Sequence, residues 1–157
     1  MADIQVNIPK ISVFNDVAQQ TAYIGQTRTD KNGMPMYEQI AVFKSDFPMI
    51  ERFWRDGIGF LASKLKRKIV SISPQQPIPG NNTNEVIVIS FSIGENFDSS
   101  YRETIKSSVF SYFVNYVTAK WLLIKLPDEA AKYDTYATQN LNDVIEKVFF
   151  KKAPKRP

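Results

Sequence analysis

The chain contains neither histidine nor cysteine among its 157 residues. Histidine is the commonest general base near neutral pH, and the two residue types supply most nitrogen and sulfur ligands for transition metals. Their absence excludes histidine- and thiol-based catalysis and leaves only oxygen ligands for a metal ion. We therefore predict that the protein is not an enzyme and that it binds no cofactor.

Other features are missing as well. Without cysteine there is no disulfide framework, which suits a reducing compartment. The first residues have neither the basic start nor the apolar stretch of a signal peptide, so we expect none. The longest apolar stretch, residues 109–126, is too polar for a membrane span, because five polar residues interrupt it: Ser111, Asn115, Thr118, Lys120 and Lys125. The glycine-rich phosphate-binding motifs of nucleotide-binding proteins are also absent.

What the chain does have is the composition of one globular domain rich in aromatic residues. Its 11 Phe, 7 Tyr and 2 Trp residues suit a large core or a protein interface. The net charge is +4, and four residues near the C-terminus account for it: Lys151, Lys152, Lys155 and Arg156. We predict a single domain over residues 11–150 and a basic tail over 151–157. The tail is either a solubilising terminus or a contact for a partner subunit or DNA.

The spacing of apolar residues predicts four helices. A short helix spans residues 11–25, with Gly25 closing it. A second begins after Ser45 and Asp46 and ends in the basic residues Lys64, Lys66, Arg67 and Lys68. A long helix over 99–126 is followed, after Pro127, by a final helix to residue 150, and the short link predicts an antiparallel helical hairpin. Gly57 and Gly59 lie inside the second helix, which predicts a close backbone contact or an irregularity there.

Two segments alternate in the manner of strands, residues 69–73 and 85–93, and we expect them to form a two-stranded antiparallel hairpin. The loop between them, residues 74–84, is rich in proline and amides and should project as a contact arm, with Ile78, Pro79 and Asn81 as candidate contacts. Asn32 and Gly33 predict a tight turn, followed by an extended segment over 36–43. We interpret residues 1–10 as a second arm, since Pro9 blocks regular pairing. The predicted fold class is α+β, mainly α.

Two clusters are candidate interaction sites. Small polar residues follow one face of the long helix, which is either solvated or a close contact with another subunit: Thr104, Ser108, Ser111, Asn115 and Thr118. In the second helix, Glu51, Arg52 and Asp56 surround Trp54, which suggests a buried pair, a substrate site or, more simply, an ordinary pair of Arg52 with Asp56 one turn away. The candidate partner contacts from these clusters are Arg52, Trp54, Ser108, Ser111 and Asn115.

Three segments resemble a family of small structural proteins of tailed bacteriophages and prophages of Bacteroides-like gut bacteria, the crAss-like phages or their relatives. They are residues 17–25 (VAQQTAYIG), 49–54 (MIERFW) and 111–121 (SYFVNYVTAKW). Residues 129–133 (EAAKY) and the basic tail are similar too, so the resemblance covers most of the chain outside the proline-rich loop.

The resemblance implies a virion structural protein of the neck or head–tail connector type. Such a protein would form a homo-oligomeric ring, contact the portal and neighbouring neck or tail proteins, and surround the DNA channel. It would be assembled in the host cytoplasm and found in the virion, without a membrane. Two alternatives are a tail-completion protein and a small basic phage protein that binds DNA through Lys151, Lys152, Lys155 and Arg156.

Overall fold

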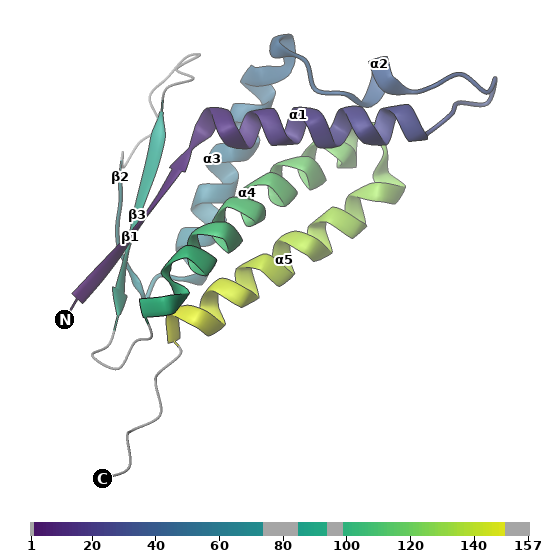
Figure 1. Cartoon of the computed structure of the whole chain (residues 1–157). Helices are drawn as coiled ribbons and strands as arrows, with labels where there is room; N and C mark the ends of the chain where they lie inside the picture. The colour runs from purple at the N-terminus through teal and green to yellow at the C-terminus, as the bar shows by residue number, and fades with distance from the viewer. Residues whose placement is uncertain (1, 74–84, 94–98, 150–157) are drawn as a thin grey trace.

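The computed structural model describes residues 2–73, 85–93 and 99–149. Its α+β fold is mainly helical and confirms the predicted fold class (Figure 1). The elements in chain order are β1 (Ala2–Pro9), α1 (Lys10–Thr27), α2 (Tyr37–Ile40), η1 (Lys44–Asp46), α3 (Phe47–Lys64), β2 (Ile69–Ser73), β3 (Val86–Ile93), η2 (Ser99–Tyr101), α4 (Arg102–Lys125) and α5 (Pro127–Phe149). The four long helices agree with those predicted, and α4 and α5 form the antiparallel hairpin.

The sheet has three antiparallel strands in the order β1-β3-β2. The hairpin of β2 and β3 is confirmed, but the prediction of an N-terminal arm is wrong. Ala2 to Pro9 pair residue by residue with Ile93 to Val86 of β3. The strand forms because alternate residues are apolar and bury their side chains under the helices: Ile4, Val6 and Ile8. Pro9 occupies the last position of the ladder, where the chain turns into α1, so it does not prevent pairing.

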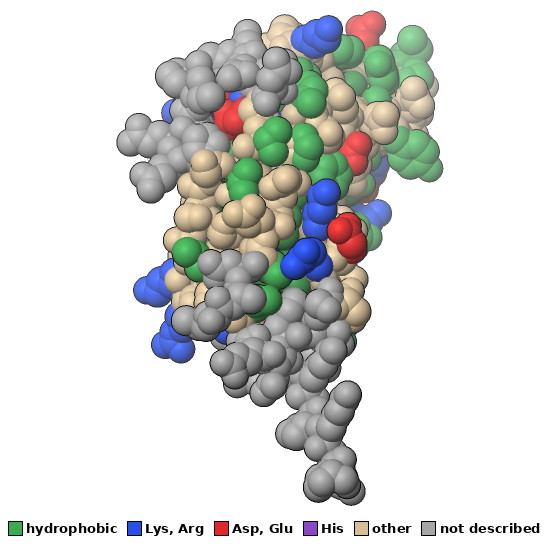
Figure 2. All heavy atoms as spheres, turned by 60° about the vertical axis from the view of Figure 1, so that its left-hand side comes forward, with side chains coloured by type: hydrophobic (Ala, Val, Ile, Leu, Met, Phe, Trp, Pro, Cys, Tyr) green, Lys and Arg blue, Asp and Glu red, His purple; other side chains and the backbone are tan. Residues whose placement is uncertain are grey.

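All the long helices cover one face of the sheet (Figure 1). The centre of the core is aromatic: the ring of Trp54 on α3 lies 4.6 Å from Phe113 on α4 and 6.2 Å from Phe14 on α1, measured between centroids. The opposite face of the sheet carries exposed polar residues such as Gln5, Asn7 and Ser71. On the side that Figure 2 brings forward, uncharged side chains and backbone predominate over the middle of the surface. No helix in the described part of the chain is long and apolar enough to cross a membrane.

Part of the polar face of α4 packs against other helices of the same chain, an arrangement that neither interpretation of this face had included. The Ser108 hydroxyl donates to the Asp143 carboxylate, and the Asn115 amide donates to the Asn140 side-chain carbonyl at 2.8 Å, both on α5. Thr118 is fully buried against α1, 3.2 Å from the Gln20 amide oxygen. The remaining two differ: Ser111 is half-buried and Thr104 is exposed. Small side chains let α5 and α1 approach α4 closely at Ser108, Asn115 and Thr118, whereas Ser111 and Asn115 also line a small open pocket between α1 and α4.

The segment between α1 and α3 forms the predicted turn, with Gly33 at a φ of 77°. The extended segment expected after it is instead interrupted by the short helix α2. This helix lies against α1 so closely that a Cβ on Gly25 would come within 2.7 Å of the Tyr37 Cα. The Trp121 indole N–H donates to the Ile40 carbonyl at 2.6 Å and ties α2 to α4. These contacts with residues distant in sequence override the local preference.

Candidate interaction surfaces

The two predicted contact residues of α3 have opposite environments. Trp54 is fully buried in the core, so its assignment as a partner contact is wrong. It lies on the inward stripe of α3, where Phe14 and Phe113 pack against its ring. Arg52 is exposed and lines a groove between the N-terminal half of α3 and the C-terminal end of α4.

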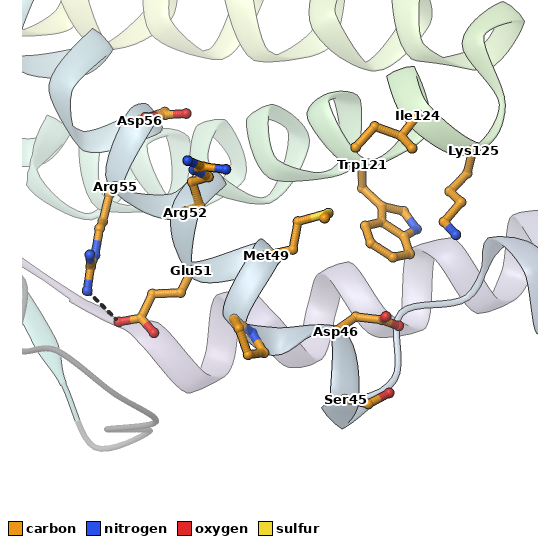
Figure 3. A pocket seen from close by; sticks show the side chains of 11 residues that line it. Ser45, Asp46, Met49, Glu51, Arg52, Arg55, Asp56, Trp121, Ile124 and Lys125 are labelled. Atoms are coloured by element: carbon orange, nitrogen blue, oxygen red, sulfur yellow. Dashed lines mark hydrogen bonds and ion pairs between the residues drawn. The ribbon is translucent and has the colours of Figure 1, made fainter.

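This groove, which we call the α3–α4 groove, is open and has a volume of about 1030 Å³. Figure 3 shows its lining residues: Ser45, Asp46, Pro48, Met49, Glu51, Arg52, Arg55, Asp56, Trp121, Ile124 and Lys125. Two apolar side chains are left largely to solvent there, Met49 at 46% and Ile124 at 57%. Trp121 contributes to the lining although it is itself nearly buried. Apolar side chains and charges therefore alternate along this surface.

The groove holds three cations and three carboxylates. On α3 the pair one turn apart joins Arg55 to Glu51, with 3.4 Å between Nη2 and Oε1, rather than the expected Arg52 and Asp56. Figure 3 shows this contact as a dashed line. Arg52 and Asp56 stay exposed along the groove, and the Lys125 ammonium lies 5.1 Å from the Trp121 ring centroid. These charges remain accessible to a binding partner.

Behind the groove lies a buried ion cluster in which Glu51, a candidate for a buried pair, meets two residues that the sequence analysis had not singled out, Lys10 and Glu85. The Lys10 ammonium lies 3.2 Å from Glu51 Oε1 and 3.5 Å from Glu85 Oε2, and all three side chains are nearly inaccessible. The Glu85 carboxylate accepts no hydrogen bond from the described residues, so Lys10 is its principal partner among them. Buried charges of this kind are tolerated only when paired. The cluster therefore fixes the junction of β1 and α1 against α3 and the start of β3.

Each outer strand of the sheet has one edge that pairs with no other described strand. Within the described residues, β1 and β2 each pair only with β3. A smaller groove of about 420 Å³ runs beside β1 and is lined by Asn7, Pro9, Ser12, Glu103, Lys106, Ser107 and Phe110. Unpaired strand edges offer backbone donors and acceptors to another chain.

The described residues offer packing surfaces and ion pairs. Among the described residues, no three Asp or Glu side chains gather in a way that could hold a metal ion. The predicted contacts Ile78, Pro79 and Asn81 lie outside the described residues, as do the basic residues Lys151, Lys152, Lys155 and Arg156. Both sets stay predictions. The structure adds Met49 and Ile124, whose helical positions gave no signal that they would remain exposed.

Comparison of the chain with protein-family models, with curated proteins and with solved structures gives no match. Its role must therefore be inferred from its own sequence and surfaces.

Proposed function

We propose that the protein is a structural subunit of a tailed-phage particle, of the neck or head–tail connector type, that assembles into a homo-oligomeric ring between portal and tail. The observation that carries the proposal is the α3–α4 groove. It combines exposed apolar side chains, Met49 and Ile124, with charges of both signs around them. Protein–protein interfaces have this composition, an apolar centre within a polar rim.

A ring of identical subunits needs two different faces that fit each other, because each subunit contacts its neighbours head to tail. The α3–α4 groove supplies one such face on rigid elements, since α3 and α4 pack through the aromatic core. In this arrangement the groove receives a surface of the adjacent subunit or of a neighbouring virion protein. The resemblance of residues 17–25, 49–54 and 111–121 to phage structural proteins supports the same role, and residues 49–54 lie partly in the groove.

Two adjacent residues of α4 allow a matched test. Leu123 and Ile124 are equally exposed, at 59% and 57%, but only Ile124 lines the groove. The Ile124→Asp substitution should lower incorporation of the protein into phage particles at least about tenfold, because a charge would enter the apolar centre of the contact. The Leu123→Asp substitution should leave incorporation unchanged. The measurement is the amount of each variant in gradient-purified particles, with circular dichroism confirming that both fold.

Equal incorporation of the two variants would contradict the groove as the assembly contact. Failure of a phage lacking the protein to show any defect in joining heads to tails would contradict the connector role itself. Normal joining combined with unstable or incomplete tails would favour the tail-completion protein.

A further inference from the structure

The hydrogen bonds at the two ends of the sheet establish which backbone groups of β1 are free. The Lys10 N–H donates to the Glu85 carbonyl at 2.9 Å, and the Ser92 N–H donates to the Lys68 carbonyl at 2.7 Å. Along a strand, the peptide groups of successive residues point to opposite edges. On β3, the backbone N–H and C=O groups of the odd-numbered residues therefore point to β1, and those of the even-numbered residues point to β2. Both hydrogen bonds agree with this assignment.

The register then assigns the groups on β1. Its even-numbered residues stand opposite odd-numbered residues of β3, as Ile8 opposite Ile87 and Val6 opposite Ile89. These residues direct their N–H and C=O groups to β3. The peptide groups of Asp3, Gln5 and Asn7 consequently face the free edge.

The two edges of the sheet differ in how open they are to another strand. β2 has 5 residues, and its register shifts between Ile69 and Ser71. Such irregularities and short lengths discourage pairing at an edge. β1 has 8 residues in continuous register, with Pro9 only at its end. The long regular edge of β1 is therefore the one suited to accept a strand.

The groove beside β1 places α4 along this edge. Its lining from β1 consists of Asn7 and Pro9, both edge-facing positions, and its lining from α4 includes Glu103, Lys106 and the half-buried Phe110. The wall of the groove thus carries one acidic and one basic side chain, both exposed. A surface with this pair of opposite charges can complement a copy of itself.

We propose that β1 pairs with β1 of a second copy of the chain, antiparallel and about a twofold axis at Gln5. Gln5 then stands opposite Gln5 of the partner subunit, and Asp3 opposite Asn7 of the partner subunit. All three positions direct their peptide groups to the shared edge, so each pair exchanges two backbone hydrogen bonds. Glu103 and Lys106 of both subunits then line the joined edge, each beside Asn7 and Pro9 of its own β1. The pairing shields the open edge in the free protein, and it does not rest on the proposed connector role.

Backbone amide exchange tests the pairing directly, because the inference predicts an alternation. At high protein concentration the solution mass should be that of two chains, and the amides of Gln5 and Asn7 should exchange slowly. On dilution to single chains those two amides should exchange at least about tenfold faster, while the Val6 amide, bonded to β3, stays protected. A protein that remains a single chain at all concentrations would overturn the proposal. So would a dimer in which the Gln5 and Asn7 amides exchange freely.

Charge reversal provides a test in variants that keep the fold, since both residues are exposed. Glu103→Lys alone and Lys106→Glu alone should each weaken dimerisation at least about tenfold, because the groove walls of both subunits then carry charges of a single sign. The double substitution should restore it, and Lys66→Glu, at an exposed position outside the groove, should have no effect. Failure of the double variant to recover would contradict the proposed contact. Gln5→Pro, which deletes an edge N–H that β3 does not use, should also abolish pairing, and persistence of the dimer would exclude the proposed register.

Discussion

The Tyr112 hydroxyl on α4 donates a hydrogen bond of 2.8 Å to the backbone carbonyl of Gly57 on α3. The contact is close because Gly57 has no side chain: a Cβ there would lie 3.0 Å from the Tyr116 ring. The prediction of close backbone packing at Gly57 is confirmed, but Gly59 has open space around its Cα. The packing of α3 against α4 therefore requires a glycine at position 57, whereas the space around position 59 would accept a larger side chain.

The glycines predict opposite effects of the same substitution. Gly59→Ala should raise the free energy of unfolding by about 0.5–1 kcal/mol, since alanine favours the helix and meets no neighbour. Gly57→Ala gains the same preference but pushes the Tyr116 ring, so it should be less stable than Gly59→Ala by at least about 1 kcal/mol. Urea denaturation of the two variants and the wild type measures both. Equal stabilisation by the two substitutions would show that α3 and α4 leave room for a methyl group between Gly57 and the Tyr116 ring.

Tyr112 gives the protein a defined sensitivity to alkali. Burial, aided by the neighbouring Tyr116, raises the pKa of the Tyr112 phenol far above its ordinary value of 10.0. In the unfolded chain the phenol ionises near pH 10, so the unfolded state releases its proton first and the free energy of unfolding falls as the pH rises past that value.

Tyr112→Phe should reduce this alkaline loss and, at neutral pH, cost about 1 kcal/mol for the missing hydrogen bond to Gly57. The free energy of unfolding measured between pH 7 and pH 11 tests both effects. If the free energy of unfolding of the variant fell with pH as steeply as that of the wild type, the alkaline loss could not be assigned to the Tyr112 phenol. Part of the slope should remain, because burial also raises the pKa of Tyr116.

Asp143 gives the contact between α4 and α5 a sensitivity to acid. Burial alone would raise the pKa of its carboxyl, but hydrogen bonds from Lys147 and Ser108 outweigh burial and lower it below the ordinary 3.8. Because the folded-state pKa is lowered, the stabilisation is present above about pH 4 and is lost as the pH falls through the folded-state value.

Asp143→Asn should therefore be less stable than the wild type at pH 7, and the difference should shrink toward pH 2. Thermal denaturation across this range measures it. Glu146→Gln is a suitable control, because Glu146 is exposed on the same helix. A difference between Asp143→Asn and wild type that is independent of pH would indicate lost packing rather than lost charge.

The buried cluster predicts strong coupling among its three members. Lys10→Met should cost about 3–5 kcal/mol, since it leaves the Glu51 and Glu85 carboxylates buried without their cation. Adding Glu51→Gln and Glu85→Gln to Lys10→Met should recover much of that loss. Chemical denaturation of the single and triple variants tests the coupling. Additive losses would mean that the three side chains stabilise the fold independently.

Most of the helical architecture was predictable because it depends on local spacing, as in the apolar stripe of α4 through Val109, Phe113 and Val117, all fully buried. The strand β1 was not, because a proline disfavours strand pairing and Pro9 closes this segment, although Ile4 and Val6 alternate as in a strand. Its pairing partner is β3, remote in sequence, so no local signal fixed it.

The candidate site was less predictable, because exposure depends on tertiary packing. The aromatic ring of Trp54 fits a core and an interface equally well on sequence grounds, and only the packing of Phe14 and Phe113 decides between them. The Lys10 cluster joins residues from α1, α3 and the start of β3, and none of them is distinctive in sequence. Arg52 alone of the predicted α3 contacts lies on the surface that the structure offers.

The most direct test of the proposed virion role is to ask whether the protein is part of the particle. Particles from cells that produce the phage with a tagged copy of the chain are purified through a density gradient, washed in high salt and analysed by quantitative mass spectrometry. A structural connector should co-sediment with tailed particles in a fixed number of copies that survives the wash. Recovery of the chain only in the soluble fraction, or its release from particles by salt, would contradict the account.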